Sequence, residues 1–379
     1  MTISTAVIRL GAGALLAHMA LSLPLWHPPV ERVFPLLPAL GEACAPREHI
    51  GDAVLSKVWP IVLLAGALWP QKRWLLAATG LGLLGLISID LNRLQPWTYF
   101  YLLTWGVLFF EKENPAPTLR LLLAGVYVWG GLNKLTPYFA EENFPWFCQA
   151  FAWTKPLGQY PELGYATAVG EALLGVGLLW WRSRPYVRYL AVGFHLFILL
   201  ALSPLGLGWN AVVIPWNAAM AGMVWVCAAG PPNRAREAKA WWLDLYQSPT
   251  NRAILALVWL LPALNWAKLW PEALSWKMYS NTQPEVGFYV WSEEVLCSEL
   301  RSMWSRHSWD YNMRLQYDDW AMDELHVPMF NHPYTHRQLA RYLCNCVKDR
   351  GEAGLWRLEV TPWRHGDEQW EETPCTGLR

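Results

Sequence analysis

Long apolar runs constrain this chain more than any other feature of its sequence. A helix that spans a bilayer needs roughly 17–25 mostly apolar residues. The chain is 54% hydrophobic and only 16% charged, whereas ordinary soluble domains are about 25% charged. We therefore predict an all-α polytopic membrane domain over 1–269, with about nine spans near 6–26, 53–70, 74–90, 97–111, 118–137, 163–181, 188–206, 210–228 and 252–269. The limits of the second to fourth spans are the least defined.

Positive charge in the short loops predicts the orientation of these spans, because cytoplasmic loops carry an excess of lysine and arginine. The basic residues fall in alternate loops and near the N-terminus: Arg9, Lys72, Arg73, Lys112, Arg120, Arg182, Arg184, Arg188, Arg234, Arg236, Lys239 and Arg252. With nine spans, all of them lie on one side. This pattern predicts a cytoplasmic N-terminus and a periplasmic, lumenal or extracellular location for the chain after residue 270.

The last part of the chain, 270–379, changes abruptly to a charged and aromatic composition. Alternating apolar and polar residues predict strands at 286–291, 311–317 and 354–360. Helical spacing is seen around 293–304, 318–325 and 335–348. We expect a small α+β extracytoplasmic domain.

Cysteine placement agrees with this orientation. Six of the seven cysteines fall in segments predicted to lie outside: Cys44, Cys148, Cys297, Cys344, Cys346 and Cys375. Disulfides persist in oxidising compartments, so these six are the disulfide candidates. Their pairing cannot be read from the sequence, although Cys344 and Cys346 are too close together to bridge each other easily. Alternatively, the cysteines are packed thiols.

Three ionisable residues lie inside apolar runs and are the candidate catalytic residues. Glu171 interrupts the run 163–181, Lys134 lies near the outer end of 118–137, and His195 lies within 188–206. Such groups are costly in hydrocarbon unless they are paired or face a cavity. We expect the three to line one pocket in the outer half of the membrane, where Glu171 and His195 could form an acid–imidazole pair. Alternatively, Lys134 snorkels to the interface, Glu171 makes a structural hydrogen bond and His195 is a packing residue.

A turn rich in glycine and proline at 203–217 supplies candidate substrate-binding residues. Irregular backbone at membrane depth is tolerated only where it is buried or lines a cavity. We expect Asn210, Trp216 and Asn217 to line that cavity, with Asn133 beside Lys134 as a further contact; a capped helical hairpin is the alternative. The aromatic outer loop 138–162 and the loop 27–52 either roof the pocket or anchor in the interface.

Several kinds of site are excluded by the sequence. It contains no CxxC pair, nucleophile elbow, phosphate loop or dinucleotide fingerprint. Cys344 and Cys346 with His332 and His336 are too loosely spaced for a metal site, so no metal is expected. The net charge is zero, so no nucleic-acid partner is expected.

Three segments resemble, in the same order, a known membrane domain. YVWGGLNKL (127–135), VGEALLGVGLLWW (169–181) and VGFHLFILLALSPLG (192–206) are similar to the horizontally transferred transmembrane (HTTM) domain of vitamin K-dependent γ-glutamyl carboxylases and their bacterial relatives. The resemblance covers about 100 residues. A weaker similarity to DoxX- and MauE-type redox-associated membrane proteins covers the same segments.

The resemblance implies a quinone or quinol as substrate or cofactor and a site that opens to the lumenal side. In the carboxylases, the lysine that matches Lys134 acts in the oxygenation of reduced vitamin K, which generates a base strong enough to remove a glutamyl γ-proton. This chain departs from the family where the motif has a lysine pair and Asn133-Lys134 stands instead. Its outer domain is also much shorter, and no propeptide-binding region is recognisable.

Three classes of function fit these features. The first is a membrane enzyme that acts on a quinol or another lipid-soluble substrate. The second is a non-catalytic accessory or docking subunit of a membrane redox or export complex, with the bilayer and other membrane subunits as its partners. The third, a small-molecule carrier, is disfavoured because no inverted repeat is evident.

Overall fold

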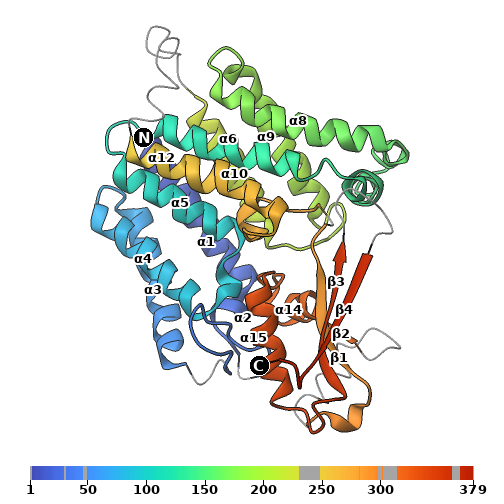
Figure 1. Cartoon of the computed structure of the whole chain (residues 1–379). Coiled ribbons are helices and arrows are strands. Elements are labelled where there is room, and N and C mark those ends of the chain that lie inside the picture. Colours follow the sequence, from blue (N-terminus) through green and yellow to red (C-terminus); the bar gives the residue numbers. More distant parts are fainter. Residues whose placement is uncertain are drawn as a thin grey trace. The chain divides into compact units, whose positions relative to one another are not determined.

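The computed structural model describes residues 2–29, 31–45, 49–229, 248–280, 282–297, 301, 314–360 and 368–378 (Figure 1). The chain divides into two compact units, each built from several segments. The first unit comprises Met1–His18, Pro60–Leu81 and Pro96–Asn281, and the second comprises Met19–Trp59, Gly82–Gln95 and Thr282–Arg379. The basic residues Arg234, Arg236 and Lys239 lie outside the described residues.

The chain is mostly helical, as predicted. Within the described residues, four helices are long and apolar enough to cross a membrane: α1 (Ile3–Leu21), α3 (Ile50–Leu68), α8 (Pro161–Leu179) and α9 (Arg184–Leu202). Shorter apolar helices are α4 (Arg73–Ile89), α6 (Ala116–Leu132) and α10 (Val213–Cys227), and α5 (Pro96–Phe110) has 15 residues. Length and composition thus support membrane integration through four helices, while nine spans stay a prediction.

Proline marks where several of these helices begin. α5, α8 and α12 (Pro249–Ile254) each start at a proline, whose fixed φ suits the first helical position and whose missing N–H would have had no partner there. The ninth apolar run does not form one regular helix. It continues from α12 into a π-helix, η5 (Leu255–Leu260), and then a 3-10 helix, η6 (Leu261–Ala267). Pro262 near the start of η6 lacks the N–H that a regular ladder needs.

The second unit contains a four-stranded antiparallel sheet in the order β2-β1-β3-β4. The strands are β1 (Glu285–Val290), β2 (Arg314–Gln316), β3 (Ala353–Val360) and β4 (Glu368–Pro374). The helices α14 (Tyr317–Leu325) and α15 (Pro333–Cys344) contact β1, and α15 also contacts β3. The α+β prediction is therefore confirmed for the C-terminal part of the chain.

Strand β4 is the element that sequence periodicity missed. Its residues EQWEETP are mostly polar and exposed, because β4 is an edge strand that pairs only with β3 among the described strands. Within the described residues, the predicted strand at 311–317 corresponds to β2, and Tyr317 already begins α14. Residues 311–313 and half of the predicted helix 293–304 lie outside the described residues.

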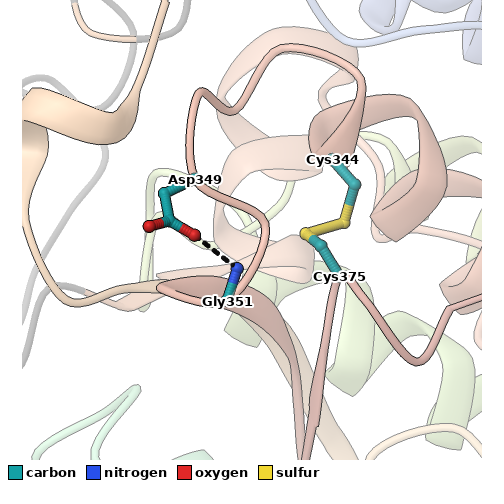
Figure 2. The surroundings of a disulfide bond; sticks show 4 residues. All are labelled: Cys344, Asp349, Gly351 and Cys375. Atoms are coloured by element: carbon teal, nitrogen blue, oxygen red, sulfur yellow. Dashed lines mark hydrogen bonds between the residues drawn. A yellow bond between two sulfur atoms is a disulfide. The ribbon is translucent and has the colours of Figure 1, made fainter.

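Two disulfides connect elements of this C-terminal part. Cys297 pairs with Cys346, and Cys344 pairs with Cys375. The Cα–Cα distances of 5.4 and 5.6 Å are ordinary for such bridges. Figure 2 shows the second bridge near a turn in which the Asp349 carboxylate accepts the N–H of Gly351 at 2.9 Å. These bridges fit an oxidising compartment for this part of the chain.

The expected disulfides of Cys44 and Cys148 are not present in the described part of the chain. The four C-terminal cysteines bridge one another, so they offer no partner to the two N-terminal ones. Cys148 is a buried thiol at the end of α7 (Phe144–Cys148). Cys44 instead joins Leu36 in an isolated backbone bridge.

The second unit also holds two buried ion pairs contributed by segments far apart in the sequence. Arg32 binds Asp90 at 3.2 Å, and Arg93 binds Asp52. The Glu324 carboxylate of α14 accepts the N–H groups of Val33 and Phe34 at 2.8 and 2.7 Å.

These bonds join loop 27–52 to the C-terminal part within one unit. Each compact unit is thus built from several segments, while the membrane domain 1–269 and the outer domain 270–379 stay predictions.

Candidate functional site

The candidate site lies within the first unit, where α6 and α8 pack closely. A Cβ on Gly131 of α6 would lie 2.4 Å from the Ala168 carbonyl oxygen of α8, and one on Gly175 would lie 2.5 Å from the Ala124 oxygen. Real Cβ atoms do not approach that closely, so small residues permit this crossing. This close packing brings Lys134, in the turn after α6, next to Glu171 of α8.

The closest of these contacts is an ion pair between Lys134 and Glu171. Lys134 Nζ lies 2.8 Å from a Glu171 carboxylate oxygen and also donates to the Gly130 carbonyl at 3.2 Å. Each side chain is only 11% exposed. Gly130 makes room for the acid, because a Cβ there would lie 2.7 Å from the other carboxylate oxygen. An ammonium has three N–H donors, so Lys134 retains one for a ligand.

A second polar group consists of Tyr127, His195 and Asn217. Nδ2 of Asn217 donates to the Val213 carbonyl at 2.9 Å, so Oδ1 faces His195 Nδ1, also at 2.9 Å. An amide oxygen only accepts, which places the imidazole proton on Nδ1. His195 Nε2 then accepts from the Tyr127 hydroxyl. This direction of donation leaves the lone pairs of the Tyr127 oxygen to accept from a ligand.

Both polar groups line one cavity of about 530 Å³, a volume within the range of small-molecule sites. Its remaining wall is dominated by apolar and aromatic side chains, among them Phe139, Phe144, Phe147, Phe194, Phe197 and Trp216. Such a wall suits a flat ring, and a few polar groups fix its orientation.

Five of the residues predicted for the site line this cavity: Lys134, Glu171, His195, Trp216 and Asn217. This agrees with the expected shared pocket, while their functional roles stay predictions. The pairing differs from the acid–imidazole alternative, since Glu171 binds Lys134 and His195 binds Tyr127 and Asn217.

Asn133 and Asn210 do not line the cavity and instead form hydrogen bonds with the backbone. The Asn133 amide donates to the Ser275 carbonyl at 2.7 Å. Asn210 adopts φ 31° in the turn before α10, and its side chain accepts from the Val212 N–H at 3.3 Å. Asn210 thus caps a turn, which agrees with the alternative of a capped helical hairpin.

The segment 268–280, which no sequence pattern indicated, supplies Met278 and Tyr279 to the cavity. Trp276 and Tyr279 have φ of 59° and 55°, a region that bulky side chains rarely adopt. Asn143 holds this segment by donating to the Tyr279 carbonyl at 2.7 Å, and Trp276 stacks on Tyr99. Only tertiary contacts specify this course of the backbone.

Tyr127 was also not predicted as a site residue, although its spacing from Lys134 could have indicated it. It precedes Lys134 by seven residues, and that spacing places two side chains on one helix face two turns apart. At 1.5 Å rise per residue, seven residues correspond to about 10 Å along a helix, and Lys134 lies in the turn that directly follows α6.

Comparisons with family models, with curated proteins and with solved structures find no match for this chain. Its chemistry is therefore inferred from the residues of the site.

Proposed function

We propose that this protein is a multi-pass membrane enzyme that binds a quinone, a quinol or another lipid-soluble molecule with a flat ring. The observation that carries the proposal is the placement of two polar groups on the wall of one aromatic cavity. Lys134 with Glu171 forms one group, and Tyr127 with His195 and Asn217 forms the other. The order of the three segments that resemble the HTTM domain supports the same substrate class.

The two groups can handle protons of a ring hydroxyl. The Glu171 carboxylate accepts the proton, and the remaining N–H of Lys134 donates to the resulting oxyanion, which it stabilises electrostatically. At the other group, Tyr127 passes its proton to His195 Nε2 and takes one from the ligand, so the imidazole holds the transferred charge. A carbonyl oxygen in place of the hydroxyl would accept from Lys134. A bound quinone would supply the redox chemistry itself.

Exposed tryptophans support the membrane setting of this unit. Trp69 follows α3, Trp180 follows α8 and Trp209 lies between α9 and α10; all three are exposed. Tryptophan at helix ends is typical of membrane–water interfaces. The basic loops favour a cytoplasmic N-terminus, which would place this site in the outer half of the membrane.

Binding to the full-length protein in lipid nanodiscs tests the proposal. A prenylated naphthoquinol, kept reduced, should bind to the wild type because its hydroxyl can donate to the Tyr127 oxygen. Tyr127→Phe should weaken its binding about ten-fold, which corresponds to about 1.4 kcal/mol and to one lost hydrogen bond. Tyr101→Phe is the matched control, because Tyr101 is buried in α5 but does not line the cavity.

Equal affinities of both variants would contradict the assigned role of Tyr127. If the wild type bound neither the quinol nor the quinone, the enzyme proposal would fail. A stable complex of the wild type with another membrane subunit would then favour the accessory function.

A further inference from the structure

The cavity is polar at its buried end and apolar at its exposed rim. Tyr127, His195 and Asn217 are at most 5% exposed, whereas the lining residues Trp153 and Leu157 are 68% and 40% exposed. A ligand that fills this cavity therefore places its polar head inside and its apolar part at the rim.

The rim is formed by three elements of the first unit. Trp153 and Leu157 belong to the segment that leads into and through η4 (Lys155–Gln159), and Leu163 and Ala166 belong to the first turns of α8. Phe197 of α9 completes the rim, with its ring centroid 6.2 Å from that of Trp153.

The contacts that join the η4 segment to α9 at this rim are ring contacts. The ring of Phe151 stacks on that of Trp153 at 5.8 Å and meets that of Phe197 at 6.1 Å. Ring rotation at these contacts can widen the opening without breaking a hydrogen bond between the rings, because the contacts are stacked or edge-to-face packing.

The surface that continues from the rim is apolar. Val169, Leu173 and Val176 of α8 are exposed, as are Leu196 and Leu200 of α9. Both helices are among the four that are long and apolar enough to cross a membrane.

The exposed lining residues Trp153, Leu157, Leu163 and Ala166 carry no charge. An opening with such a rim, on such a surface, faces hydrocarbon more favourably than water.

We propose that the opening between η4, α8 and α9 is a lateral portal through which the ligand enters from the bilayer. The ligand class is an amphiphile with a ring head and an apolar tail. Its head reaches the polar end of the cavity, and its tail stays in the lipid beyond Trp153. This inference extends the proposed function, because it assigns the route and the tail of the same ligand.

Helix geometry provides a matched pair of variants. Leu163, Ala166, Thr167 and Glu171 all line the cavity, at the spacing of one helix face. Ala166→Trp would fill the opening from a position that is already exposed. Val169→Trp adds a comparable bulk at an exposed α8 residue that does not line the cavity. At 100° per residue, Val169 lies about 160° around the helix from Thr167 and Glu171.

The native thiol of Cys148 reports access to the cavity without any quinone. Cys148 lines the cavity, and burial raises the pKa of its thiol, so labelling is run at pH 8. The probes are a long-chain alkyl maleimide dissolved in the bilayer and a sulfonated maleimide in the water. Peptide-resolved mass spectrometry of the full-length protein in liposomes gives the labelling rate at Cys148.

The alkyl maleimide should label wild-type Cys148 at least ten times faster than the sulfonated reagent. Ala166→Trp should reduce this rate at least ten-fold, whereas Val169→Trp should stay within two-fold of the wild type. Equal rates in the two variants, comparable rates with the two reagents, or no alkyl labelling of the wild type would each overturn the portal. Portal-dependent labelling in a protein that binds no quinone would leave the portal standing and contradict the proposed substrate.

Discussion

At the scale of single residues, the site depends on charges that are sheltered from hydrocarbon. The sequence identified Lys134, Glu171 and His195 as costly groups, because each interrupts an apolar run. It did not identify their partners, because the position of a residue along a helix does not define the direction in which its side chain points. In the structure, Lys134 neutralises Glu171, and His195 lies between a phenol and an amide.

Removing one member of the Lys134–Glu171 pair should destabilise the protein more than removing both. Lys134→Met leaves a buried carboxylate and Glu171→Leu leaves a buried ammonium, and each should cost about 3–5 kcal/mol. The double variant replaces the pair by apolar side chains and should recover most of that loss. Denaturant unfolding of the first unit, followed by tryptophan fluorescence in detergent, measures these differences.

Ligand binding by the same three variants tests the function of the pair separately from its contribution to stability. Each variant lacks the Lys134 donor, the Glu171 acceptor or both, so all three should bind the naphthoquinol more weakly than the wild type. A double variant as unstable as either single one would show that the two side chains act independently.

At the scale of elements, the crossing of α6 and α8 determines where the ion pair forms. The glycines of both helices were evident in the sequence, and small residues favour close approach. Which glycine meets which neighbour was not evident, because several of them share each helix. The structure assigns the contacts to Gly130, Gly131 and Gly175.

Gly131→Ala should separate the two helices, because its new methyl group would overlap backbone atoms of Ala168 and Ala172. We expect a loss of about 1–3 kcal/mol from overpacking and weaker ligand binding, since Glu171 would move away from Lys134. Gly170→Ala on α8 is the control. A Cβ there meets nothing within 4 Å, so this change should be neutral or stabilise the helix by up to about 1 kcal/mol. Thermal unfolding in detergent compares the two, and equal effects would contradict the close-packing explanation.

At the scale of the whole molecule, two units share the chain in alternating segments. The abrupt change of composition near residue 270 predicted a simple division into a membrane part and an outer part. That division stays a prediction. The second compact unit contains Met19–Trp59 and Gly82–Gln95 together with the C-terminal sheet, and ion pairs and hydrogen bonds join these segments. Composition reports local preference and does not reveal such long-range bonds.

Reporter fusions test the predicted orientation. Alkaline phosphatase fused at the C-terminus should be active and green fluorescent protein there should be dark, because the C-terminal disulfides indicate an oxidising compartment. Fusions inserted in the loop at Lys112, between α5 and α6, should give the opposite result, since that loop carries positive charge. The reverse pattern at both positions would overturn the orientation, and the same result at both would overturn the span count between them.

The sequence by itself determined which segments are apolar, which side chains have an unfavourable free energy of burial and which part of the chain forms the sheet. These properties follow from residue type and local periodicity, which every stretch of the chain carries in its own composition. Only the tertiary structure decided that Lys134 meets Glu171, that Tyr127 completes the second polar group and that Cys344 bridges Cys375. Those outcomes depend on the rotation and close approach of separate helices and strands, and the free energy that selects them comes from contacts between residues distant in the chain.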